Sequence, residues 1–201
     1  NNDGIHGVAY NADIYGFKAL NASGVGTDTT LGTALGLIEN IAAIDIINNS
    51  WGGAGNCTSE SSCRTAIGST VYDNWEDLSQ LSTPKISVFA AGNDGTSEPS
   101  PQCQSMVYNN DINAVSVCVV ATSHYTGSSY NVADGALATF SNKCGKVSAY
   151  CIAAPGDYLW SLRHNSNGEK FESGTSMAAP MVSGGLAIIM QEFSSLTPAQ
   201  V

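Results

Sequence analysis

Short, predominantly apolar segments alternate with amphipathic segments along this chain, and that alternation limits the fold more than any other feature. The apolar segments are rich in β-branched residues and have the length of single strands. They are "IDIINNS" (44–50), "ISVFAA" (86–91), "AVSVCVVAT" (114–122) and "YCIAAPG" (150–156). Strands without a polar face must be covered on both sides. We therefore predict an α/β protein with three layers, in which a mostly parallel sheet has helices on both faces.

Further elements complete the predicted order. A strand is expected over 12–20, "ADIYGFKAL", at the beginning of the alternation. Helices are predicted after a cap at Thr27 or Asp28, over 61–81, and after the strand at 150–156. The first of these helices is predicted to bury one apolar side, made by Leu31, Leu35, Ile38 and Ala42.

The acidic composition excludes some classes of partner. The chain has 201 residues, enough for one domain with a substantial core, and its net charge is -10. Its 7 basic residues are scattered, so no nucleic-acid partner is predicted. The longest apolar stretch is interrupted by Pro180, Ser183 and two glycines, so no transmembrane span is predicted either.

Six cysteines indicate an exported protein. None of them forms the C-x-x-C pair typical of zinc or thioredoxin-like sites, so disulfides are expected. The predicted pairing joins sequence neighbours: Cys57 with Cys63, Cys103 with Cys118, and Cys144 with Cys151. Other pairings stay open. Disulfides persist in oxidising compartments, so a secreted or bacterial cell-surface location is predicted.

The segment "ESGTSMAAPMVSGGLAIIM" (172–190) places a hydroxyl at the start of an apolar helix. Ser176 could simply cap that helix. However, Gly174 leaves space above the hydroxyl, and Ala178 and Ala179 let the helix approach its neighbours closely. The free N–H groups at a helix start also stabilise negative charge. Ser176 is therefore a candidate nucleophile.

Four segments resemble the subtilisin-like serine proteases, in the order in which that family carries them. "GTSMAAP" resembles the nucleophile motif, "FAAGNDG" the oxyanion segment, and "INNSWGG" the substrate-binding strand. "NNDGIHGVAYNADIYGFKAL" resembles the stretch after the family's histidine-bearing helix, and the similarity covers essentially the whole chain. The resemblance implies a subtilisin-like fold and a serine endopeptidase that cleaves polypeptides through an acyl-enzyme.

The same resemblance assigns roles to particular residues. Ser176 would attack the substrate, and Asn93 would donate its side-chain amide to the oxyanion. Taken alone, Asn93 would be part of a Gly-Asn-Asp-Gly turn. The residues implied to pair with the extended substrate are Ser50, Trp51 and Gly52. Those implied to form the opposite wall of the cleft are Ala90, Ala91 and Gly92.

A finer resemblance concerns the C-terminal third of the chain. "FSNKCGKVSAYCIAAPG" and "SSLTPAQV" resemble the subtilases that Gram-negative bacteria carry as autotransporter passengers. Thr197 and Pro198 are typical of a helix start, so a new helix begins where the chain stops. Residues 1–201 are therefore expected to be the C-terminal portion of one peptidase domain, incomplete at both ends.

The family's Asp and His motifs, Asp-[ST]-Gly and His-Gly-Thr-His, do not occur in the chain. His6, His124 and His164 all follow the position where the family places its histidine, so none inherits a catalytic role. Two interpretations stay open. The protein is an endopeptidase whose Asp and His lie in a preceding segment or another chain, or it is a catalytically inactive binding or adhesion module. The pair formed by Ser176 and Asn93 favours the first.

A metal-dependent hydrolase is a third class. Paired acids that could bind a cation are Asp94 with Glu98 and Asp45 with Asp73. No His-x-x-x-His spacing accompanies them, so no catalytic metal or cofactor is expected. Structural calcium in "NNDG" or "GNDGTSE" remains an alternative to a solvated acidic loop.

Overall fold

A sheet of four parallel strands lies at the centre of the part of the chain that the structure describes. The structure is a computed structural model, and it describes residues 5–123, 134–163 and 168–201. The strands lie side by side in the order β1 (Ile46–Asn49), β2 (Ile86–Ala90), β3 (Ser116–Ser123) and β4 (Cys151–Asp157). Each neighbouring pair is parallel, which confirms the predicted direction of the strands.

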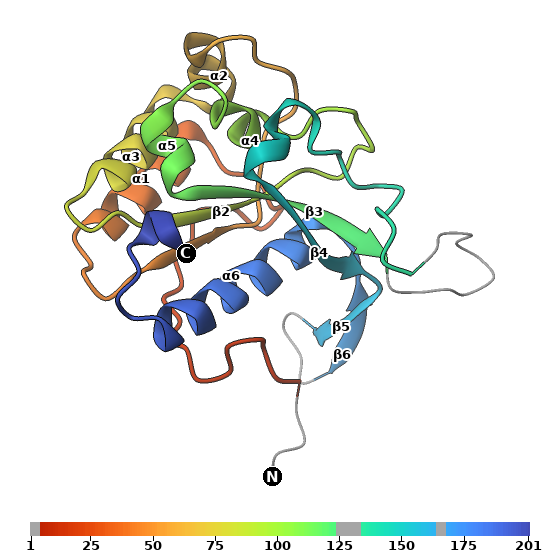
Figure 1. Ribbon diagram of the computed structural model, residues 1–201. Coiled ribbons are helices and arrows are strands. Elements are labelled where there is room, and N and C mark those ends of the chain that lie inside the picture. The colour runs from red at the N-terminus through yellow and green to blue at the C-terminus, as the bar shows by residue number, and fades with distance from the viewer. Residues whose placement is uncertain (1–4, 124–133, 164–167) are drawn as a thin grey trace.

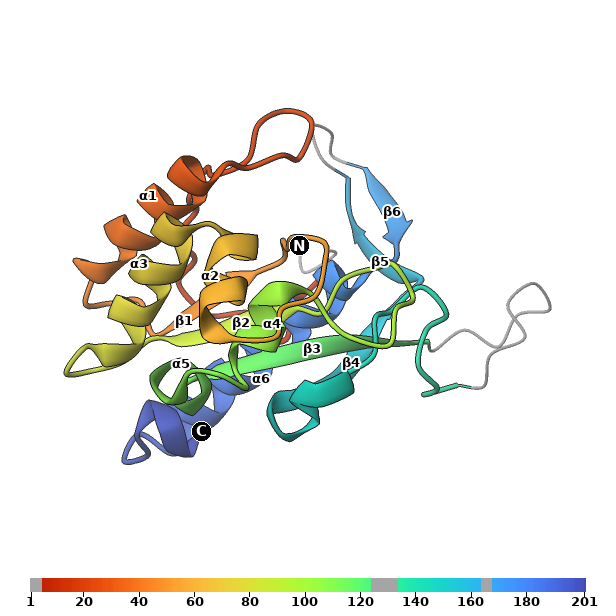
Figure 2. The ribbon, with the colours of Figure 1, turned by 90° about the horizontal axis from the view of Figure 1, so that it is seen from above.

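Helices cover both faces of this sheet, which confirms the predicted three-layer α/β fold (Figure 1). One face carries α1 (Asp28–Glu39), α2 (Glu60–Ile67), α3 (Ser69–Gln80), α4 (Pro101–Ser105) and α5 (Asn110–Ala114). The other face is covered by α6 (Thr175–Glu192), which contacts all four strands. Figure 2 shows α1 and α3 side by side on the face opposite α6.

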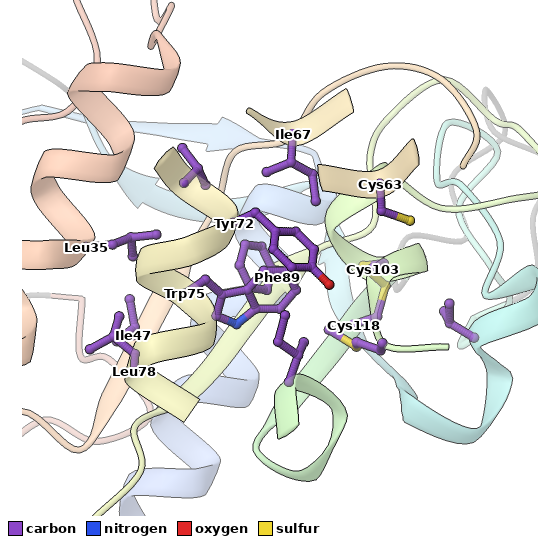
Figure 3. Packing of buried hydrophobic residues seen from close by; sticks show 14 of the residues in the cluster. Leu35, Ile47, Cys63, Ile67, Tyr72, Trp75, Leu78, Phe89, Cys103 and Cys118 are labelled. Atoms are coloured by element: carbon purple, nitrogen blue, oxygen red, sulfur yellow. A yellow bond between two sulfur atoms is a disulfide. The ribbon is translucent and has the colours of Figure 1, made fainter. Parts of the chain in front are cut away.

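Two hydrophobic cores hold these layers together. The larger core lies between the sheet and the layer of α1 to α5, and its centre is the contact of Trp75 with Phe89, 4.6 Å between ring centroids (Figure 3). The smaller core lies between the sheet and α6, where Ala178 and Ala179 are fully buried. Because these side chains are small, α6 lies close against the sheet, and its first residues are held at a fixed height above the strand ends.

The six cysteines form three disulfides between sequence neighbours. The bonded pairs are Cys57–Cys63, Cys103–Cys118 and Cys144–Cys151, which confirms the predicted pairing. Structural disulfides of this kind agree with an exported protein. Within the described ranges, no helix is long and apolar enough to cross a bilayer.

The helical segments differ from the prediction at two places. The single helix predicted over 61–81 is wrong, because α2 and α3 are separate helices that meet at Gly68. Gly68 has a φ of 105°, and a Cβ there would lie 2.4 Å from Oδ1 of Asp28, so only glycine fits this junction. The first helix begins after the Thr27 cap, as predicted, but it ends at Glu39, so Ala42 lies outside it and is exposed.

The strand predicted over 12–20 is wrong, since this segment forms no strand. Its apolar side chains are only partly covered: Phe17 packs against the larger core, whereas Ile14 is 92% exposed. A strand requires a neighbour that pairs with its backbone N–H and C=O groups. Here an apolar cavity of about 1010 Å³ lies between this segment and β1, so the segment has no strand beside it in the described part of the chain.

The chain between β3 and α6 is also more structured than predicted. The strand predicted over 150–156 is confirmed as β4, which runs through Pro155 to Asp157. Proline is tolerated there because β4 is the edge strand of the described sheet. An antiparallel hairpin that was not predicted, β5 (Leu159–Leu162) with β6 (Glu169–Glu172), then leads into α6.

The described residues also include the 3₁₀ helices η1 (Gly145–Tyr150) and η2 (Pro198–Gln200), and Thr197 caps the second.

Candidate active site

Ser176 lies in the first turn of α6, beside the carboxyl end of β1. Its hydroxyl donates to the backbone carbonyl oxygen of Ser50 at 3.2 Å, and the Ser50 hydroxyl donates to the Ser176 carbonyl at 2.9 Å. The start of α6 is joined to β4 as well, since the Gly174 N–H donates to the Gly156 carbonyl at 2.7 Å. The serine is thus held between two strands, and its side chain is half-buried.

Asn93 lies in the exposed loop after β2, and the residue that precedes the serine orients its side chain. Both the backbone N–H and the hydroxyl of Thr175 donate to Oδ1 of Asn93, at 2.8 and 2.9 Å. The fully buried Thr175 hydroxyl also accepts the Gly92 N–H at 3.1 Å. Because a backbone N–H can only donate, the oxygen of the Asn93 amide must face Thr175. The amide nitrogen Nδ2 therefore faces away from Thr175.

Two donors border the same space beside the Gly174 α-carbon. A Cβ on Gly174 would lie 3.5 Å from Nδ2 of Asn93 and 3.6 Å from the backbone nitrogen of Ser176. As a residue of the first helical turn, Ser176 has no acceptor for its N–H one turn earlier in the helix. An oxygen in this space would therefore meet two N–H donors and the positive end of the α6 dipole. This arrangement can stabilise an oxyanion.

The predicted substrate-binding residues lie on two segments that leave neighbouring strands. Ser50, Trp51 and Gly52 follow β1, and the Trp51 ring packs edge-to-face on Phe89, with 5.6 Å between centroids. Trp51 therefore places its side chain against the core, and its backbone is the part that a peptide could pair with. Of the opposite wall, Ala90 and Ala91 are buried and Gly92 is half-buried.

A pocket of about 350 Å³ begins where these two walls end. Its lining comes from the loops after β1 and β2 and from the segment before η1. These residues are 53–56, 94, 96–100 and 142. The small residues Gly53 and Ala54 are part of this lining and leave room for a side chain of a bound peptide.

The described residues supply no general base at the serine. The hydrogen bond of the Ser176 hydroxyl goes to a backbone carbonyl, which cannot take up the proton at neutral pH. His6 is exposed near the beginning of the described chain, where its ring contacts Tyr10. His124 and His164 lie outside the described residues. The site therefore contains the candidate nucleophile and oxyanion donors without an activating base.

Metal binding finds little support in these side chains. Across the described ranges, no group of three or more His, Cys, Asp and Glu is close enough to hold an ion. Asp73 pairs with Arg64 at 2.5 Å, and Glu98 accepts the Lys146 backbone N–H at 3.1 Å. "NNDG" lies outside the described residues, and calcium needs about six or more oxygen ligands. Structural calcium stays a prediction, and no chemical step is assigned to it.

Two residues of the site could not be found from local pattern. Thr175 stands next to the candidate nucleophile, but its contact with Asn93 joins residues 82 positions apart. Asn142 forms hydrogen bonds to the loop that carries Asn93, and its bond to Asp94 joins residues 48 positions apart. The signal that could have found Thr175 is its place within "GTSMAAP". Asn142 lies within "FSNKCGKVSAYCIAAPG", but that resemblance assigns no role to it.

Comparison with known proteins identifies the family. The model of the subtilase family matches residues 1–201, so the chain belongs to the subtilase family. Alkaline serine exoprotease A of Vibrio alginolyticus is 30% identical over 200 residues, which are 98% of this chain and 31% of that protein. Subtilisin DY of Bacillus licheniformis is 28% identical over 201 residues, which are 100% of this chain and 62% of that protein.

Solved structures agree with this membership. Sphericase superposes with a TM-score of 0.70 at 27% sequence identity, and the match covers 98% of this chain and 60% of sphericase. The subtilisin-like fold expected from the sequence is thereby confirmed. The chain spans about three fifths of the length of subtilisin DY and sphericase, and less than a third of the exoprotease.

Proposed function

We propose that this protein is a serine endopeptidase in which Ser176 is the nucleophile. The observation that carries the proposal is the space beside Gly174, bordered by Nδ2 of Asn93 and the backbone nitrogen of Ser176. In the reaction, the Ser176 hydroxyl oxygen attacks the peptide carbonyl carbon while its proton passes to a base. The carbonyl oxygen becomes negative and occupies the space between the two donors. Collapse of this intermediate releases the amine and leaves an acyl-enzyme, which water then hydrolyses.

The substrate in this proposal is an extended polypeptide that pairs with the backbone of Ser50, Trp51 and Gly52. This pairing resembles the addition of a strand to a sheet edge, where main-chain hydrogen bonds provide affinity and pockets provide selectivity. The pocket of about 350 Å³ supports the proposal, because it can receive one substrate side chain and its lining includes Gly53 and Asp94, which follow Gly52 and Asn93 in the chain.

We infer that the base and its orienting carboxylate come from a segment outside residues 1–201. The cavity of about 1010 Å³ supports this inference, because its lining includes the free edge of β1, the segment 12–20 and Ser50. A strand in that cavity, parallel to β1, would cover the apolar side chains that now face it. Its carboxyl end would lie beside Ser50, within reach of Ser176. The inference would be contradicted by a gene whose coding sequence upstream of Asn1 contains neither an Asp-[ST]-Gly nor a His-Gly-Thr-His.

Labelling with a fluorophosphonate probe tests the nucleophile in the intact protein, with any segment that precedes Asn1 in place. Fluorophosphonates react with activated serines, so the wild-type protein is expected to be labelled at Ser176. The Ser176→Ala variant should lose the label. Ser183→Ala is a matched control on the same helix and should keep it, because the Ser183 hydroxyl donates to Asn48 and Ala179 and not to the site. An unlabelled wild-type protein would instead support the inactive binding module.

Replacement of the oxyanion donor is the second test. We expect Asn93→Ala to lower kcat by about 100- to 1000-fold with a small change in KM, because the donor acts mainly in the transition state. Steady-state hydrolysis of a peptide substrate measures both constants. A large rise in KM with unchanged kcat would show that Asn93 binds substrate and does not stabilise the oxyanion.

A further inference from the structure

We propose that Asn142 is a positioning residue for the oxyanion donor. The inference rests on the role proposed above for Asn93, since Asn142 acts on the oxyanion through that side chain. Asn142 lies between β3 and η1 and is 4% exposed. It lies behind the loop 91–96, and it also contributes to the lining of the pocket of about 350 Å³.

Four hydrogen bonds join Asn142 to the residues on both sides of Asn93. Before Asn93, Nδ2 of Asn142 donates to the Ala91 carbonyl at 3.0 Å, and the Asn142 backbone N–H donates to the Gly92 carbonyl at 3.0 Å. After Asn93, the Asp94 and Thr96 N–H groups donate to Oδ1 of Asn142 at 2.9 and 3.1 Å. The loop is therefore attached to Asn142 on both sides of the donor, through the Asn142 side chain at Ala91, Asp94 and Thr96 and through its backbone N–H at Gly92.

The shape of the loop and the Asn142 side chain depend on each other. Gly92 has a φ of 105°, a conformation that favours glycine, and a Cβ there would lie 2.3 Å from Nδ2 of Asn142. The three side-chain bonds also require one donor and one acceptor within the same short group. Among side chains of this size an amide provides both, whereas a carboxylate accepts only. Asn142 therefore matches this loop in both volume and hydrogen-bonding character.

Other contacts keep the loop attached when the Asn142 side chain is changed. The Gly95 N–H donates to the Phe140 carbonyl at 2.8 Å, and the Lys143 N–H donates to the Thr96 carbonyl at 2.9 Å. A shorter side chain at position 142 should therefore loosen the loop without releasing it. Looser attachment lets Nδ2 of Asn93 move out of the oxyanion space. Small displacements of this kind lower kcat more than they weaken the binding of substrate.

A double-mutant cycle in the intact protein tests the proposal. We expect Asn142→Ser to lower kcat by about tenfold with KM nearly unchanged, because the donor is misplaced in the transition state. In the Asn93→Ala background, the same replacement should change kcat by less than about twofold, because no donor remains to be positioned. Asn142→Asp provides a second arm, since it keeps the volume and the acceptor bonds but cannot donate to Ala91. Comparison of Asn142→Asp in the wild-type and Asn93→Ala backgrounds subtracts any direct effect of the new negative charge on the oxyanion.

Asn109→Ser is the matched control for a loss of stability alone. Asn109 is 7% exposed and also holds a loop through its amide, because it caps α5 and donates to Glu60 and Glu76. It should lower the thermal midpoint as Asn142→Ser does while leaving kcat within about twofold.

The outcomes of this experiment are separable. If wild type has no Ser176-dependent hydrolysis, the proposed function fails before the cycle begins. If wild type is active, two results overturn the role of Asn142. One is an unchanged kcat in both Asn142 variants, and the other is an equal loss of kcat with and without Asn93. Circular dichroism of each variant shows whether it is folded, and Asn142→Asp decides the question if Asn142→Ser does not fold.

Discussion

At the scale of single residues, the site depends on hydrogen bonds that orient donors. Thr175 is fully buried and uses its hydroxyl twice, as a donor to Asn93 and as an acceptor from Gly92. The sequence identified Ser176 and Asn93 as candidates, because each lies in a short segment that resembles the family. It could not show which way the Asn93 amide points, because that depends on a contact between residues 82 positions apart.

Removal of the Thr175 hydroxyl should therefore weaken catalysis. We expect Thr175→Val to lower kcat by about tenfold, because it removes one bond to Asn93 and leaves the Gly92 N–H without its buried acceptor. Thr175→Ser keeps the hydroxyl and should restore most of the activity. Hydrolysis of a peptide substrate compares the three proteins. Equal activity in Thr175→Val and wild type would show that Thr175 does not orient Asn93.

At the scale of elements, α3 is capped by a residue of another helix. Its first residue follows Gly68, which has no side chain and forms no side-chain cap. Asp28 of α1 takes this role instead, because its carboxylate accepts the Val71 N–H at 2.9 Å and the Thr70 N–H at 3.3 Å. Partial desolvation acts to raise the pKa of Asp28, but the hydrogen bonds from Val71 and Thr70 hold it below its ordinary value. The helical pattern indicated one long helix here because the apolar spacing continues across Gly68.

This contact predicts how stability depends on pH. Asp28→Asn should lower the free energy of unfolding by about 1 kcal/mol at pH 7, as the loss of a helix cap does. The folded pKa of Asp28 is lower than the unfolded one, so its contribution is complete above the unfolded pKa and decreases as the pH falls through the folded pKa. Urea unfolding of both proteins between pH 7 and pH 3 should show the difference shrinking in acid. A difference independent of pH would contradict the role of the carboxylate charge.

At the scale of the whole molecule, the disulfides cross-link segments that pack in or against the larger core. The bond Cys103–Cys118 connects α4 to β3 across 15 residues, whereas the other two span 6 and 7 residues. Alternation of strands and helices predicted the sheet and its two layers correctly, because that pattern is repeated over the whole chain. It failed over 12–20, where the strand pattern is present but the neighbouring strand is not.

The disulfide with the largest closed loop should contribute most to stability. We expect Cys103→Ala with Cys118→Ala to lower the free energy of unfolding by about 3 kcal/mol, since the reduced unfolded chain gains conformational freedom. The pair Cys144→Ala with Cys151→Ala closes a shorter loop and should cost less. Denaturant unfolding of each double variant gives the two values. The reverse order would show that strain or packing, and not loop length, decides the contribution.

Patterns that repeat within a few residues predicted the α/β class, most strands, the start of α1 and the disulfide pairing, and they indicated a candidate nucleophile. These features depend on neighbouring residues, so they are readable from the chain alone. The contacts that orient the site connect distant segments, such as Ser50 with Ser176 across 126 positions and Asn142 with Asp94 across 48. Such contacts exist only after the strands have aligned their carboxyl ends. For this reason folding was needed to show how Thr175 and Asn142 contact the loop of Asn93, the proposed oxyanion donor.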